Sequence, residues 1–357
     1  MGQRADSSGS TAAAAPPDTA AKVAFLRSPA AWPPGAGEVR VIETHMSWVF
    51  MTRAFVYKMK KPVRTPFLDF STLERRHHFC LEEVRLNRRL APDVYLGVTP
   101  LLRLADGSLA LGETRDGGIR RDEGTAVEWL VHSRRLPAAR MLDRALRERR
   151  ADAAAVRPLA ARLARFYASL PPLDLSAETY VERLRAAVEL NHAILSRTAF
   201  GLDRGTVDRL ADGLRGFLRQ HGATLGRRAT ERRIVEGHGD LRPEHVCLTS
   251  PPVVIDCLEF NRAFRELDPV DELGFLAMEC ELLDGAFVGP VLFEAYVSAT
   301  GDRFPPALGA FYQAGRAQLR ARLCIAHLED HRPAAERRRW RDRARRYLDR
   351  GIARIGG

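Results

Sequence analysis

The character of the sequence changes near His132, from strand-like to helical. Before that position, runs of β-branched and aromatic residues are separated by short polar stretches, as in antiparallel hairpins. These predicted strands begin near residues 39, 48, 54, 94, 109 and 125. Beyond it, apolar residues recur at helical spacing over 142–170, 180–196 and 207–221. This order predicts an α+β chain of two lobes, with a small β-rich N-lobe over 23–132 and a larger helical C-lobe over 133–357.

Two helix starts can be identified from capping residues. Ser71-Thr-Leu-Glu74 has the pattern of a capping box, and apolar residues at helical spacing follow it until Pro92 ends the pattern. Further along the chain, Asp268 precedes a helix that is expected to begin near Val270. The first of these helices therefore lies inside the β-rich lobe.

The first 22 residues are rich in Ala, Ser, Pro and Gly and contain few large apolar side chains. Such a segment cannot bury enough apolar surface to offset the entropy lost on ordering. We therefore expect residues 1–22 to form a disordered tail.

Charge and cysteine content narrow the class of protein. A net charge of +11 favours anionic partners. The five cysteines form no CxxC pair, so neither a zinc ribbon nor a redox motif is indicated. Every apolar run is shorter than the roughly 20 residues that span a bilayer, and the N-terminus lacks the apolar core of a signal peptide. We expect a cytoplasmic protein without a membrane partner.

The segment 238–246 reads His-Gly-Asp-Leu-Arg-Pro-Glu-His-Val, and Val-Val-Ile-Asp256 follows it. In the catalytic loop of kinases, an Asp accepts the proton of a substrate hydroxyl and a residue five positions later helps to hold a metal ion. Asp240 and His245 stand at these two positions. Asp256 ends a strand-like run, where it could bring a carboxylate to Mg²⁺. The two segments predict phosphoryl transfer, although Asp240 could instead cap a turn and Asp256 could form a salt bridge.

Two lysines of the third predicted strand are candidates for contact with phosphate. Lys58 and Lys60 are two residues apart and so project from one face of the strand. Lys58 is preferred because Val56, Tyr57 and Met59 frame it, and Lys60 is the alternative. On the following helix, Glu83 is preferred to Glu82 as the ion-pair partner of the lysine, with a surface role open for either acid.

The order of these residues, Lys then Glu then Asp then Asp, is the order found in two-lobed kinases. Residues 39 to about 330 resemble the aminoglycoside phosphotransferase branch of the protein-kinase-like fold. More narrowly, the chain is similar to a bacterial aminoglycoside phosphotransferase-like family of unknown substrate in the segments 43–50, 57–63, 67–74 and 86–92. Some members of that family carry an added P-loop ATPase domain, whose Gly-x-x-x-x-Gly-Lys-Ser/Thr motif does not occur in this sequence.

The resemblance implies ATP or GTP as the phosphoryl donor, Mg²⁺ as a cofactor and a hydroxylated small molecule as the acceptor. Two departures from the kinase pattern stand out. His245 replaces the expected Asn, and Mg²⁺ prefers oxygen to imidazole, so His245 either joins a metal site or hydrogen-bonds a phosphate or the base. Residues 44–53 contain no glycine where a glycine-rich loop should cover the phosphates, which leaves the Ser47 hydroxyl and nearby amides as substitutes. Adenine is expected near residues 128–134.

Two other functions remain open from the sequence. One is a nucleotide-binding pseudokinase or scaffold without transfer activity, which His245 and the missing glycine loop favour. The other is a basic nucleic-acid-binding protein, which the lack of an RNA-recognition motif disfavours. The arginine-rich stretch 316–354 predicts an amphipathic helix pair with solvated arginines, or else a docking surface for an anionic substrate or RNA. The sequence leaves the acceptor and the oligomeric state open, and the basic chain makes cationic aminoglycosides a poor choice of acceptor.

Overall fold

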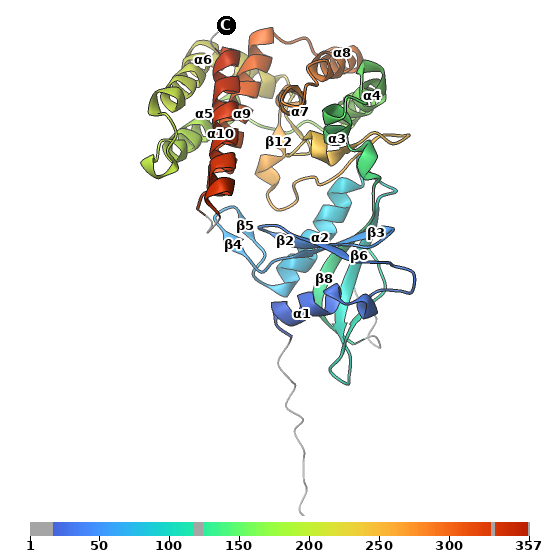
Figure 1. Ribbon diagram of the computed structural model, residues 1–357. Helices are drawn as coiled ribbons and strands as arrows, with labels where there is room; N and C mark the ends of the chain where they lie inside the picture. The colour runs from blue at the N-terminus through green and yellow to red at the C-terminus, as the bar shows by residue number, and fades with distance from the viewer. Residues whose placement is uncertain (1–16, 117–123, 330–332, 356–357) are drawn as a thin grey trace, which may run out of the picture. The chain divides into compact units, whose positions relative to one another are not determined.

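The computed structural model describes residues 17–116, 124–329 and 333–355 (Figure 1). These residues divide into two compact units. The first contains the described residues up to Arg88 together with Pro92–Arg135, and the second contains Arg89–Ala91 and the described residues from Leu136 onward. The β-rich and helical halves follow one another as predicted. The boundary near residue 135 lies slightly beyond the predicted one at 132.

A six-stranded antiparallel sheet forms the body of the first unit, with the strand order β1-β2-β3-β8-β6-β7. Its strands are β1 (Arg40–Glu43), β2 (Ser47–Met51), β3 (Phe55–Lys60), β6 (Tyr95–Arg103), β7 (Leu109–Leu111) and β8 (Thr125–Arg134). A short hairpin, β4 (Arg64–Thr65) and β5 (Leu68–Asp69), leads from β3 to the next helix. All six strands predicted from the sequence are present. Because β3 lies between β2 and β8, its lysines occupy the middle of the sheet.

Helix α2 (Leu73–Asn87) packs against β6 and β8 through buried side chains that include Cys80, Val84 and Leu86. Its N-cap is Thr72, whose hydroxyl accepts a hydrogen bond from the Arg75 amide at 3.2 Å. The helix therefore starts one residue later than the predicted cap at Ser71. The Ser71 side chain instead donates to Asp69 in the preceding turn.

A second helix of this unit, α1 (Thr19–Arg27), is followed by the 3-10 turn η1 (Pro29–Ala31). Its N-cap Asp18 accepts a hydrogen bond from the Ala21 amide at 2.7 Å, and Leu26 is completely buried in the core. The prediction of a disordered tail up to residue 22 is therefore wrong from Thr19 onward. Residues 1–16 of that predicted tail lie outside the described residues.

One buried carboxylate fastens both helices to the sheet. Glu128 of β8 is 3% exposed and accepts hydrogen bonds from Arg76 of α2 at 2.8 and 2.9 Å. Lys22 of α1 approaches the same carboxylate at 3.1 Å. Burying a charge is costly unless it is paired and hydrogen-bonded, as Glu128 is here. Glu128 lies in the segment where adenine is expected, but its carboxylate pairs with Arg76 and Lys22.

The second unit is helical. Its α-helices are α3 (Leu142–Arg147), α4 (Ala153–Ser169), α5 (Ala177–Leu195), α6 (Arg204–Thr230), α7 (Pro269–Glu281), α8 (Val288–Thr300), α9 (Pro306–Ala326) and α10 (Ala334–Ile355). Short 3-10 turns, η2 (Ala138–Arg140) and η3 (Thr198–Phe200), precede α3 and α6. The pattern over 142–170 forms two helices, because the chain turns through a left-handed residue, Arg149, before Asp152 caps α4. The predicted helix pair near the C-terminus is present as α9 and α10, which pack against each other.

The chain between α6 and α7 forms short, irregular elements. They are β9 (Val235–Glu236), η4 (Pro243–His245), β10 (Val246–Cys247), β11 (Val253–Val254), η5 (Arg262–Phe264) and β12 (Glu266–Leu267). β10 pairs with β11 and β9 pairs with β12, both antiparallel. The amide of Ile255 donates to the carbonyl of His245 at 2.9 Å. This pairing brings the loop at 238–245 next to Asp256.

Asp268 caps α7 as predicted, because its carboxylate accepts a hydrogen bond from the Val270 amide at 2.9 Å. The same carboxylate is fully buried and accepts two bonds from Arg228 of α6, at 2.6 and 2.9 Å. Arg228 also donates to Asp302, which follows α8. One buried arginine between two carboxylates thus joins α6, α7 and the end of α8. No helix of the described segments is both long and apolar enough to cross a membrane.

Candidate functional site

Glu272 of α7 holds the backbone of the His-Gly-Asp loop. Its carboxylate accepts hydrogen bonds from the amides of His238 at 2.9 Å and Gly239 at 2.5 Å, and from the Tyr167 hydroxyl at 2.7 Å. Glu272 is fully buried, where bonds to a charged acceptor are strong. Gly239 has a φ of 89°, and a Cβ there would lie 3.0 Å from the Arg265 side chain. The loop therefore depends on this glycine and on the glutamate behind it.

His238 is buried and hydrogen-bonds the backbone through both ring nitrogens. Its Nε2 faces the carbonyl oxygen of Ile255 at 2.9 Å, and its Nδ1 faces the amide of Asp240 at 3.3 Å. A carbonyl only accepts and an amide only donates, so the proton resides on Nε2. Burial lowers the pKa of His238 and keeps the ring neutral. The residue therefore orients Asp240 and carries no charge at neutral pH.

The carboxylate of Asp240 is partly exposed, with 30% of its side chain accessible. The Arg242 guanidinium lies beside it, with Nε 2.9 Å from Oδ1. Burial acts to raise the pKa of Asp240, but Arg242, together with His245 and Arg320, outweighs burial and holds that pKa below its ordinary value. Asp240 is therefore ionised at neutral pH, as a residue that orients a hydroxyl and accepts its proton must be.

His245 lies between the two predicted catalytic acids. Its Nδ1 is 2.8 Å from the carbonyl oxygen of Asp240, and its Nε2 is 3.5 Å from the Asp256 carboxylate. Arg242 donates to the same Nε2 at 3.2 Å. Because a guanidinium only donates and a carbonyl only accepts, Nδ1 carries the proton and Nε2 is already an acceptor. The imidazole thus lies between Asp240 and Asp256, and its acceptor nitrogen is used by Arg242 rather than by the Asp256 carboxylate.

Asp256 follows β11 and presents a partly exposed carboxylate. Its side chain is 45% exposed, and its backbone is left-handed with a φ of 60°. In the described part of the chain, no three His, Cys, Asp or Glu side chains are grouped as a metal site. Mg²⁺ keeps several waters and is often bound through one or two carboxylates and substrate phosphates. Asp256 therefore fits Mg²⁺ held in that manner, and the site does not form an all-protein cage.

In the β-rich unit, both candidate lysines pair with one carboxylate. Lys58 Nζ is 3.1 Å from Glu83 Oε1, and Lys60 Nζ is 2.6 Å from Glu83 Oε2. Glu83 is the partner rather than Glu82, which pairs with Arg85 at the surface. The Lys60 side chain is fully buried, whereas that of Lys58 is 22% exposed. Lys58 is therefore the more accessible of the two lysines.

The assignment of Ser47 to a phosphate contact is not supported. Ser47 begins β2 and is only 2% exposed. Its amide donates to the Thr44 side chain at 2.9 Å, and Thr44 donates back to the Ser47 carbonyl. Hydrogen bonds of the Thr44 side chain therefore close the tip of the β1–β2 hairpin, where the sequence has no glycine-rich loop.

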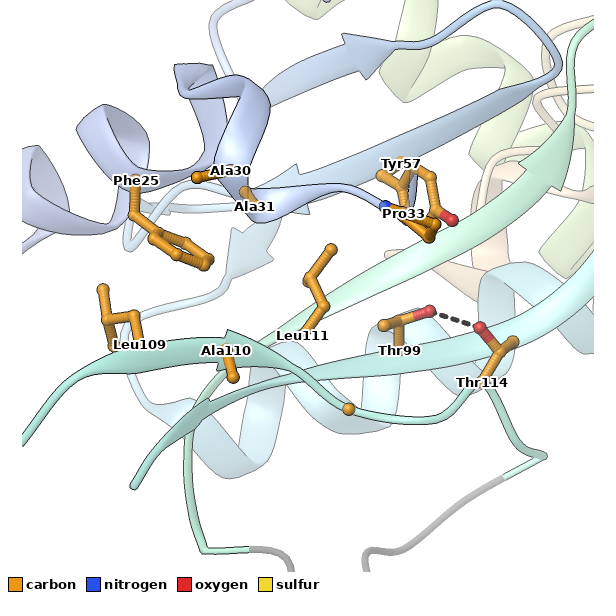
Figure 2. A pocket seen from close by; sticks show the side chains of 11 residues that line it. Phe25, Ala30, Ala31, Pro33, Tyr57, Thr99, Leu109, Ala110, Leu111 and Thr114 are labelled. Atoms are coloured by element: carbon orange, nitrogen blue, oxygen red, sulfur yellow. Dashed lines mark hydrogen bonds between the residues drawn. The ribbon is translucent and has the colours of Figure 1, made fainter. Parts of the chain in front are cut away.

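A pocket of about 450 Å³ lies on the sheet beneath η1, lined in part by Phe25, Tyr57, Thr99 and Thr114 (Figure 2). Successive residues of a strand point to opposite faces, so Tyr57 and Lys58 face opposite ways. Thr99 and Thr114 are hydrogen-bonded at 2.7 Å, and Thr114 also bonds His132 Nδ1 at 2.7 Å. The pocket is therefore separate from the pair formed by Lys58 and Glu83.

A comparison with solved structures identifies the architecture. A choline/ethanolamine kinase family protein from Mesorhizobium loti matches 94% of this chain and 98% of its own, with a TM-score of 0.52 and 18% sequence identity. The chain has a kinase-like fold. This result confirms the predicted fold class. An aminoglycoside phosphotransferase from Streptomyces rimosus also matches, over 85% of this chain and 98% of its own, with a TM-score of 0.46 and 16% identity.

Sequence comparison finds relatives of unknown activity. Uncharacterised proteins of Mycobacterium tuberculosis and Mycobacterium bovis are each 30% identical over 305 residues, which is 83% of this chain and 57% of theirs. The chain thus spans just over half the length of these relatives. No family model matches the sequence.

Proposed function

We propose that the protein is a kinase that transfers the terminal phosphoryl group of ATP or GTP to a hydroxyl of a small molecule. The observation that carries this proposal is the cluster of Asp240, His245 and Asp256. Asp240 is kept ionised, and His245 lies between it and an exposed carboxylate suited to Mg²⁺. The ion pairs of Lys58 and Lys60 with Glu83 in the β-rich unit also support the kinase proposal, since kinases use a lysine paired with a helix glutamate to bind phosphate.

In the proposed reaction, Asp240 orients the acceptor hydroxyl and takes its proton. The new oxygen–phosphorus bond forms as the bond between the terminal phosphorus and the nucleoside diphosphate breaks. Because the transition state is loose, the proton moves late and positioning dominates. Lys58 contacts the phosphates, while Lys60 and Glu83 keep it in place. Mg²⁺ bound at Asp256 would supply positive charge against the phosphate oxygens.

The comparison structures agree with a small-molecule acceptor. The Mesorhizobium loti protein is described as a choline/ethanolamine kinase family member. The five cysteines are all buried and form no disulfide, which suits the reducing cytoplasm that we propose as the location.

The test compares the wild type with Asp240→Asn and Asp256→Asn. Phosphoryl transfer to a panel of hydroxylated metabolites is measured together with Mg²⁺-dependent ADP binding. We expect Asp240→Asn to lose transfer by at least about 10²-fold and to keep ADP affinity. Asp256→Asn should weaken the Mg²⁺-dependent part of binding. A wild type that binds no nucleotide, or an Asp240→Asn variant with full activity, would overturn the proposal.

A nucleotide-binding scaffold without transfer is the second candidate. It is favoured by His245, which stands in the position of a metal-binding Asn and whose Nε2 already accepts from Arg242. Under this alternative, the wild type binds Mg²⁺ and ADP but transfers phosphate to no acceptor and not to itself.

A further inference from the structure

The helices α7, α9 and α10 bring several charged side chains together beside the catalytic loop. Arg320 of α9 donates to Glu279 of α7 at 2.7 Å and lies over the ring of Tyr347 of α10 at 5.5 Å. Its positive charge also acts on Asp240. The cluster therefore joins α7, α9 and α10.

The carboxylates of this region are already paired with arginines. The pairs are Asp271 with Arg316 at 2.7 Å, Glu279 with Arg320 at 2.7 Å and Glu244 with Arg242 at 2.5 Å. The hydroxyl of Tyr347 also donates to Glu279. An ammonium group on a substrate would have to displace a guanidinium to reach any of these carboxylates. This arrangement disfavours a cationic acceptor.

Arg343 of α10 differs from the other arginines of the cluster. Among the described residues, no carboxylate pairs with it. Its guanidinium lies 5.8 Å from the ring centres of both Trp340 and Tyr347, and its Nη2 donates to the Tyr347 hydroxyl at 3.4 Å. It is half-buried and its position is fixed by these aromatic contacts. A positioned guanidinium without a counter-ion is a receptor for a carboxylate or a phosphate, whose paired oxygens match its donors.

We infer that the acceptor is a small hydroxylated anion, whose carboxylate or phosphate binds Arg343 beside Arg320 while its hydroxyl meets Asp240. This inference rests on the proposed function and names the acceptor class.

Binding of inorganic phosphate provides the first test, because it is a simple probe of an anion site. The shift in melting temperature with millimolar phosphate, at constant ionic strength, is compared in the wild type, Arg343→Ala, Lys58→Met and Arg339→Ala. The last is the matched control, an exposed arginine on the same helix. We expect Arg343→Ala to weaken phosphate binding about tenfold, which corresponds to about 1.4 kcal/mol. Arg339→Ala should retain the shift. A shift that is lost in Lys58→Met and kept in Arg343→Ala would assign the phosphate to the nucleotide site and overturn the inference.

Sugars that share one ring and differ in charge provide the second test. Glucose 6-phosphate, glucuronate, glucose and glucosamine compete with phosphate, and the first two distinguish a phosphate receptor from a carboxylate receptor. We expect the anionic sugars to compete and glucosamine to fail. Absence of a phosphate shift in the wild type, an unchanged shift in Arg343→Ala, or tighter binding of glucosamine would overturn the inference. Stronger competition by single-stranded RNA than by either anionic sugar would also overturn it. Anion binding through Arg343 without any Mg²⁺-dependent ADP binding would reject the kinase proposal while leaving the anion site in place.

Discussion

Replacing Glu272 by glutamine tests whether this residue holds the catalytic loop. One carboxylate oxygen accepts from the Gly239 amide, and the other accepts from the His238 amide and the Tyr167 hydroxyl. Glutamine has nearly the same shape but presents an NH₂ group in place of one oxygen. At least one buried donor then faces another donor. Loss of a hydrogen bond to a charged group costs about 1.5–3 kcal/mol, so we expect a loss of about 2–4 kcal/mol in the free energy of unfolding.

Urea unfolding and steady-state transfer kinetics measure the two consequences. Because the loop carries Asp240, we expect the rate of transfer to fall by about 10²-fold, since small misplacements of a catalytic group have effects of that size. The control is Glu281→Gln, the same substitution on α7 at a partly buried glutamate that pairs with Arg350 and Arg354. Stability within about 0.5 kcal/mol of the wild type, with unchanged transfer, would refute the role of Glu272.

Two further predictions concern the β-rich unit. Lys60→Met should lower the free energy of unfolding by about 3 kcal/mol, because it removes a fully buried partner of Glu83. Lys58→Met should leave the free energy of unfolding nearly unchanged and abolish phosphoryl transfer. Equal urea midpoints for the two variants would contradict this division of roles. Burial lowers the pKa of His132 from 6.5 to about 4, so the unfolded chain takes up this proton first as the pH falls. The contribution of His132 to the free energy of unfolding is fully present above pH 6.5 and is lost between pH 6.5 and about 4. This contribution is about 3 kcal/mol. Urea unfolding at a series of pH values should show a weaker acid dependence for His132→Gln, and an identical dependence would contradict the prediction.

The central elements of the site could be predicted because they depend on local spacing. Two-residue periodicity placed Lys58 and Lys60 on one face of β3, and both pair with Glu83. The pairing of β10 with β11 brings Asp256 to the loop that carries Asp240. The sequence preferred Lys58 to Lys60 for contact with phosphate, and the greater exposure of the Lys58 side chain agrees with that choice.

Other features depend on contacts between distant residues and were missed. Glu272 lies 34 positions after His238 in the chain, and only the packing of α7 reveals that it binds the loop. The first four residues of helix α1 are predicted to belong to the disordered tail, because the helix is stabilised by distant contacts, with Leu26 in the core and Lys22 beside Glu128. Ser47 is predicted to bind phosphate because it is the polar residue of β2, and the sequence does not show that it is buried. One signal was available for Glu272: it is an acid in the first turn of α7, directly before the apolar run 273–278.

The left-handed backbone of Asp256 affects how comparisons among related chains should be interpreted. Aspartate and asparagine tolerate this conformation better than other residues with a side chain, and glycine tolerates it freely. The backbone and a bound cation therefore select overlapping sets of residues at this position. Asparagine in a relative would preserve the turn while removing the charge, so persistence of aspartate over asparagine is the pattern that would indicate selection for metal binding. Alanine at this position would combine backbone strain with loss of the carboxylate, and its effect on activity could not be attributed to the metal alone.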